Sequence, residues 1–152
     1  MEELVPEMDD LLLQLFSIVG PKNPRGIKKI LNIIRFRSTM LNSEFSYDAA
    51  TLWTLLEHIL TNENLILAYN GLGKNGSSFG QLIKNMTARQ AQDQRITIAN
   101  HIPHTDKSPN FIFKLEMFLT LANQYVTKHS IHADNLDNNF VILNNLTNEE
   151  VE

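Results

Sequence analysis

The chain has 152 residues, of which 43% are hydrophobic, and a formal net charge of −4 at pH 7. This length and composition predict one folded domain with a substantial core, while the negative charge argues against a general nucleic-acid binder. The absence of cysteine excludes disulfides and thiolate metal sites. No apolar run approaches the ~20 residues that span a bilayer, and the acidic N-terminus has no signal-peptide pattern, so we expect a cytoplasmic protein.

Apolar residues recur at the three- and four-residue spacing of a helix face along most of the chain. The predicted helices cover residues 6–19, 24–40, 46–69 with a break near Thr61, 78–86, 87–101 and 109–128. We therefore expect an all-α fold, a bundle of five to seven helices that forms a single domain over residues 1–148.

Two segments of this domain are predicted to be less regular. Residues 70–77 are rich in glycine and asparagine, which predicts a flexible connector that could divide the bundle into halves 1–69 and 78–148. The Asn-rich stretch after Asp134 carries one apolar patch at 140–143. We expect it to form either a short docking helix or a strand-like arm, followed by a tail at 144–152.

The most distinctive segment is residues 23–32. Asn23 can cap a helix, and Pro24 suits the first helical position because its missing N–H is unpaired there anyway. Six of the 13 basic residues lie between positions 22 and 37: Lys22, Arg25, Lys28, Lys29, Arg35 and Arg37. Either this charged side is simply solvated, facing the acidic first helix, or Arg25 contacts an anion near the positive end of the helix dipole, supported by Lys28 and Lys29.

This segment resembles the Asn-Pro-Arg helix in the lid of KAP-family P-loop NTPases, over about residues 20–58. The matching positions are Asn23-Pro24-Arg25, Ile27-Lys28-Lys29, Asn32, Phe45-Ser46-Tyr47 and Trp53. The resemblance implies that the chain packs on a nucleotide-binding core and that Arg25 reaches toward the phosphates. The nucleotide-binding core itself is missing from this sequence.

The chain is not expected to bind a nucleotide unaided. A phosphate-binding loop needs four residues between its first glycine and a Gly-Lys-Ser/Thr ending. Here Lys74 is followed by Asn75, and no glycine stands five positions before Gly73. The sequence therefore predicts no self-contained NTPase and no cofactor.

A ribonuclease is an alternative function. Arg95 and His101 have the Arg-x5-His spacing of HEPN ribonucleases, which the chain resembles around residues 79–104. In that family the two side chains line the cleft where RNA is cut. This sequence departs from the pattern because Ile96 replaces the usual polar residue after the arginine.

A metal site is a second alternative. The pattern His-x-x-His-x-Asp occurs twice, and histidine and carboxylate are ligands for zinc or iron. The ligands would be His101, His104, Asp106, His129, His132 and Asp134. The predicted helix 109–128 would separate the two groups by about 30 Å, which argues against one combined site.

The preferred interpretation is a non-catalytic helical interaction or regulatory module that binds a protein partner. The basic stretch leaves a nucleic-acid partner open, and the sequence predicts no oligomeric state. Glu57 and His58 are expected to form a surface pair on the helix that carries Trp53.

Overall fold

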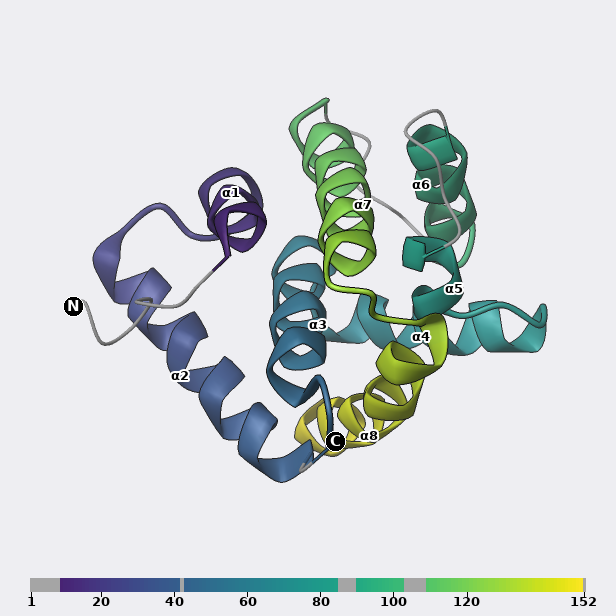
Figure 1. Cartoon of the computed structure of the whole chain (residues 1–152). Coiled ribbons are helices and arrows are strands. Elements are labelled where there is room, and N and C mark those ends of the chain that lie inside the picture. The colour runs from purple at the N-terminus through teal and green to yellow at the C-terminus, as the bar shows by residue number, and fades with distance from the viewer. Residues whose placement is uncertain (1–8, 42, 85–89, 103–108, 152) are drawn as a thin grey trace.

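The computed structural model describes residues 9–41, 43–84, 90–102 and 109–151. Within these ranges the regular secondary structure is helical, with short turns between helices and no strand, which confirms the all-α prediction (Figure 1). Eight helices are described, one more than the upper expected number: α1 (Asp10–Val19), α2 (Pro24–Leu41), α3 (Ser46–Leu60), α4 (Asn62–Lys74), α5 (Phe79–Lys84), α6 (Ala91–Ala99), α7 (Pro109–Lys128) and α8 (Ala133–Val151).

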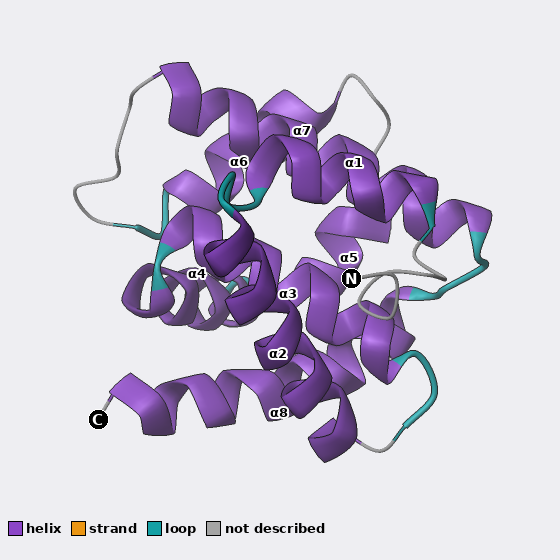
Figure 2. Ribbon diagram, turned by 90° about the vertical axis from the view of Figure 1, so that its left-hand side faces the viewer, coloured by secondary structure: helices purple, strands orange, loops and turns teal. Residues whose placement is uncertain are grey.

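Helix α3 lies at the centre of the bundle. It packs against α1, α2, α4, α7 and α8, and its middle residues Ala49 to Leu56 are all buried. A helix that is enclosed on most sides is mainly apolar around its circumference, and the buried polar side chains of α3 are Ser46, Thr51 and Thr54. Helix α2, by contrast, forms an edge of the molecule, with α3 as its main neighbour and a smaller contact to α8 (Figures 1 and 2).

Three buried aromatic rings and the partly buried ring of Tyr69, from four helices, form an aromatic cluster. The indole of Trp53 on α3 packs against Tyr69 of α4, Phe79 of α5 and Phe140 of α8, with ring centroids 5.8, 6.3 and 5.5 Å away. Such offset and edge-to-face pairs add about 0.5–1.5 kcal/mol each to the effect of apolar burial. The two halves proposed from the sequence thus share one core.

Residues 133–151 form one helix, which corrects the prediction of a tail at 144–152. Of the two alternatives for 140–143, a short docking helix or a strand-like arm, the structure has a helix, and it is longer than expected. Helix α8 runs from Ala133 to Val151. It buries one face, which consists of Leu136, Asn139, Phe140, Leu143, Asn144 and Thr147. This spacing of three and four residues is helical, and burial against α3, α4 and α5 stabilises the helix despite its Asn-rich sequence.

The predicted connector at 70–77 is also mostly helical. Helix α4 continues through Gly71 and Gly73 to Lys74 because Leu72 is buried and anchors this turn. The three residues after it form a tight turn, in which Ser77 donates its N–H to the Leu72 carbonyl at 2.9 Å. The break expected near Thr61 is confirmed, since Thr61 has a positive φ of 73° between α3 and α4.

Helix α7 has the bounds that the sequence predicts, and α1 lies along it. Asp9 joins the start of α1 to the end of α7: Oδ1 accepts the Leu11 N–H at 2.7 Å, and Oδ2 lies 2.8 Å from both Lys128 Nζ and His129 Nε2. The hydrogen bond from Lys128 is the main reason that the pKa of Asp9 falls to about 2, against a smaller opposing effect of burial.

Candidate functional site

The start of helix α2 follows the sequence prediction. The side-chain Oδ1 of Asn23 accepts the backbone N–H of Gly26 at 2.7 Å, which is the N-cap interaction, and Pro24 is the first helical residue. Gly26 allows the helix to approach the preceding turn, because a Cβ there would lie 2.8 Å from Pro21 Cβ. The Asn23 cap and the close packing of Gly26 on Pro21 together fix the position of the first turn of α2, which carries Arg25.

Helix α2 has two faces of opposite character. The inner face is buried and consists of Ile30, Leu31, Ile34, Arg37 and Leu41. The outer face carries Arg25, Lys28, Lys29, Asn32 and Phe36, all exposed, together with the half-buried Ile33. Because these positions recur at three and four residues, they form one continuous strip along the helix. We call this strip the α2 outer face.

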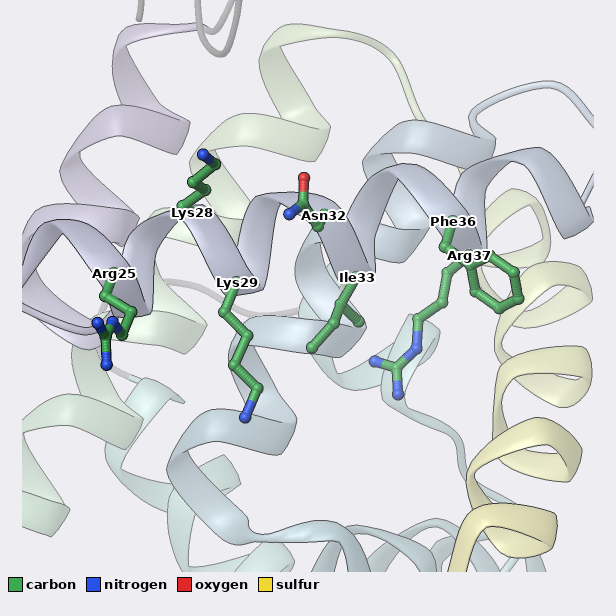
Figure 3. Close-up of a pocket in the computed structure, with 7 residues that line it drawn as sticks. All are labelled: Arg25, Lys28, Lys29, Asn32, Ile33, Phe36 and Arg37. Carbon is green, nitrogen blue, oxygen red and sulfur yellow. The ribbon is translucent and has the colours of Figure 1, made fainter.

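A shallow depression of about 490 Å³ follows the α2 outer face (Figure 3). In Figure 3, Lys28 and Asn32 lie along one edge of the strip, and Arg25, Lys29 and Ile33 lie along the other. Phe36 stands at the far end from Arg25. The structure therefore brings together the three cations predicted to contact an anion and places them beside an apolar end.

The three cations point to solvent. Within the described residues, no carboxylate forms an ion pair with Arg25, Lys28 or Lys29. Asp9, the N-cap of α1, pairs with Lys128 and His129 instead. The depression is therefore a concentration of positive charge on a chain whose net charge is negative.

The apolar end of this surface was not among the residues predicted from the sequence. Phe36 is 63% exposed and Met40 is 46% exposed, whereas large aromatic side chains are usually buried. Their spacing in the sequence could have indicated this exposure. Ile33, Phe36 and Met40 follow Lys29 at intervals of three and four residues, on the face of α2 opposite the core. Exposed apolar side chains next to one another mark binding surfaces more often than isolated ones do.

Arg37 has a structural role instead. Its guanidinium makes two parallel hydrogen bonds to the Glu57 carboxylate at 3.1 and 3.0 Å and a third to Thr54 Oγ1 at 3.0 Å. The side chains of Arg37 and Glu57 are 5% and 12% exposed, so a largely buried ion pair joins α2 to α3. The expectation that Glu57 and His58 form a surface pair is wrong, because Glu57 turns inward to Arg37.

A second depression of about 390 Å³ adjoins the first between α2 and α3. The two share Lys29 and Ile33, and the second also contacts His58. Burial, and the nearby charge of Lys114 to a smaller degree, lowers the pKa of His58 below its usual value. Lys29 is the cation that lines both depressions.

The residues of the ribonuclease alternative face different helices. Arg95 Nε lies 2.9 Å from Glu116 Oε1 on α7. His101 packs on α4, where its ring occupies the space above Gly71 and its Nε2 lies 3.4 Å from Asn75 Nδ2. The two side chains therefore make separate contacts: Arg95 joins α6 to α7, and His101 packs against α4.

The metal ligands predicted from the repeated His-x-x-His-x-Asp pattern are only partly described. His104 and Asp106 lie outside the described residues. His129 pairs with Asp9, and His132 and Asp134 are exposed. Among the residues that the structure describes, no group of three histidine or acidic side chains is close enough to hold a metal ion.

Comparisons of the chain with protein-family models, with curated proteins and with solved structures give no match. Among the helices described here, none combines the length and the apolar character that crossing a membrane requires.

Proposed function

We propose that this chain is a non-catalytic helical interaction module and that the α2 outer face binds an anionic protein surface. The observation that carries the proposal is the combination of three exposed cations, none of which pairs with a carboxylate of the described residues, with the exposed ring of Phe36 on an edge helix. A buried apolar anchor supplies most of the affinity of a protein interface, and surrounding charges set its specificity and association rate.

Helix α2 is suited to this role by the way it is held. Its inner face and the Arg37–Glu57 ion pair fix it on α3, so the outer face is presented on a rigid element. A partner then meets side chains whose backbone is already ordered, which reduces the entropic cost of binding. The Asn23 cap fixes the end of the helix that carries Arg25.

Site-specific photo-crosslinking tests this proposal. A photoreactive phenylalanine analogue replaces exposed Asn32 on α2, or exposed Gln124 on α7 as a matched control, in the organism's own cells. We expect a protein adduct at position 32 that disappears when Arg25, Lys28 and Lys29 are all changed to glutamate. No adduct at position 32, or equal adducts at both positions, contradicts the proposal.

The resemblance to NTPase lids gives the proposal a narrower form, in which the anionic surface is the nucleotide site of an NTPase core. Arg25 supports this form because it is exposed in the first turn of α2, where the helix dipole favours a phosphate. An immunoblot of the endogenous polypeptide tests whether such a core is covalently attached. A band far above 17.4 kDa favours the lid, and a band at that mass argues against an attached core.

A further inference from the structure

We infer that the partner segment of the α2 outer face is an acidic amphipathic helix that lies lengthwise along α2. This inference rests on the proposed function and specifies the partner. In this arrangement, aspartate or glutamate side chains of the partner face Arg25, Lys28 and Lys29. Its apolar side chains cover Ile33 and Phe36.

The dimensions of the surface support a helical partner. Arg25 and Phe36 are eleven positions apart, which corresponds to about 16 Å along the helix axis, or three turns. A short amphipathic helix matches this length and can place its side-chain ridges in the grooves between the α2 side chains. Since the described residues contain no strand, they offer no sheet edge to which an extended segment could add.

The order of residues along α2 specifies the pattern of the partner. The cations occupy the first two turns of α2, and the apolar side chains follow one to two turns later. A partner helix must therefore separate its apolar anchors from its carboxylates by about four to eleven residues. Lys29 lines both depressions and is the cation nearest in sequence to the apolar residues Ile33 and Phe36.

Charge complementarity favours an acidic protein segment over a phosphate polymer or a lipid surface. The whole chain carries a net charge of −4, which repels an extended polyanion. Carboxylates on one helix can meet these cations without bringing the rest of the chain near further negative charge. The exposed Phe36 ring then supplies the apolar contact that a short acidic segment needs.

A peptide-display selection tests the inference. The bait is the full chain, and the library consists of peptides of about 18 residues, five helical turns, with apolar, acidic, basic and neutral residues varied at helical spacing. We expect enriched peptides to carry carboxylates and apolar residues at the predicted separation. Binding of the enriched peptides, synthesised and measured by fluorescence anisotropy, should weaken about tenfold or more in Phe36→Ser and in the triple charge reversal of Arg25, Lys28 and Lys29.

Matched variants serve as controls. Phe113→Ser removes an aromatic ring that is also exposed, on α7, and Lys74→Glu reverses an exposed cation on α4. Both should leave peptide binding unchanged, and circular dichroism melting verifies that every variant is folded. Enrichment of neutral or basic peptides, or binding that survives both α2 variants, overturns the inference.

A lipid membrane, an RNA or a second copy of the chain would give different results with the same α2 variants. Phosphatidylcholine–phosphatidylserine vesicles or single-stranded poly-uridine RNA that bind through the α2 cations, in the absence of acidic peptide enrichment, overturn the inference. Self-association lost in Phe36→Ser, measured by analytical ultracentrifugation, assigns the face to a second copy and also overturns it. A crosslink at position 32 without acidic enrichment leaves the proposed function standing and rejects only the acidic helix.

Discussion

The indole Nε1–H of Trp53 donates a hydrogen bond to the hydroxyl of Thr147, 94 positions later in the chain, at a distance of 3.1 Å. Both residues are fully buried. Thr147 in turn donates to the carbonyl of Leu143 at 2.8 Å, so its hydroxyl both donates and accepts. This bond connects the central helix α3 with α8.

The first prediction concerns this hydrogen bond. Thr147→Val keeps the shape of the side chain but leaves the buried indole N–H without its acceptor, which costs about 1–3 kcal/mol. We expect the free energy of unfolding to fall by that amount in urea titrations followed by fluorescence of Trp53, the single tryptophan. Thr147→Ser, which keeps the hydroxyl, should lose less. Thr147→Ser deletes a buried methyl group, so a loss in Thr147→Val no larger than the loss in Thr147→Ser would argue against a stabilising role of the hydroxyl as acceptor.

The second prediction concerns the ion pair of Arg37 with Glu57. Glu57→Gln removes the negative charge to which buried Arg37 makes two hydrogen bonds, so we expect a loss of about 3 kcal/mol in the free energy of unfolding. Glu116→Gln breaks the more exposed pair with Arg95 and should cost less than about 1 kcal/mol. The double variant Arg37→Met with Glu57→Leu should recover most of the loss. Similar losses of unfolding free energy in Glu57→Gln and Glu116→Gln would contradict the stronger stabilising role of the Arg37–Glu57 ion pair.

The third prediction is a dependence of stability on pH. The pKa of Asp9 is lowered from 3.8 to about 2 in the folded chain, so the ionised carboxylate stabilises the fold. This contribution is fully present above about pH 4 and is lost as the pH falls through 2. The difference in unfolding free energy between the parent chain and Asp9→Asn should shrink over that interval. A difference that stays constant from pH 5 to pH 2 would argue against the pairing of Asp9 with Lys128.

The fourth prediction compares two glycines of helix α4. A Cβ at Gly71 would lie 2.4 Å from His101 Nδ1, whereas a Cβ at Gly73 would meet nothing within 4 Å. Alanine improves helix propensity by up to about 1 kcal/mol, but overpacking costs about 1–3 kcal/mol. Gly73→Ala should therefore raise the melting temperature and Gly71→Ala should lower it.

The cause of this difference can be isolated in a second background. In a chain with His101→Ala, the ring no longer fills the space above α4, so Gly71→Ala should become stabilising. If both glycine substitutions stabilise the parent chain alike, the contact between His101 and α4 is not formed in solution.

Local sequence signals predicted the parts of the fold that local interactions determine. The Asn23-Pro24 start of α2 and the bounds of α7 follow from caps and helical spacing, and the structure has both. Residues 144–152 were misassigned because asparagine has a low helix propensity. The apolar spacing of Leu136, Phe140 and Leu143 was present, and tertiary burial of that face outweighs the propensity of the remaining residues.

The candidate surface was predictable only in part. Arg25, Lys28 and Lys29 stand out as a cluster in the sequence, and they share one depression. Whether a residue of α2 faces outward depends on how the helix is rotated against α3. For that reason the sequence could not separate exposed Phe36 from buried Arg37, its immediate neighbour. The sequence around Arg37 also does not show that its ion-pair partner is Glu57 on another helix.

The sharing of one aromatic core by α3 and α8 has a consequence during protein synthesis. When Trp53 emerges from the ribosome, Phe140 and Thr147 have not yet been translated. At about 5–20 residues per second, the intervening 94 positions take roughly 5–20 s. The nascent chain must therefore keep a central apolar helix from aggregating for that time, which makes the interval before α8 appears the stage at which chaperones have most to contribute.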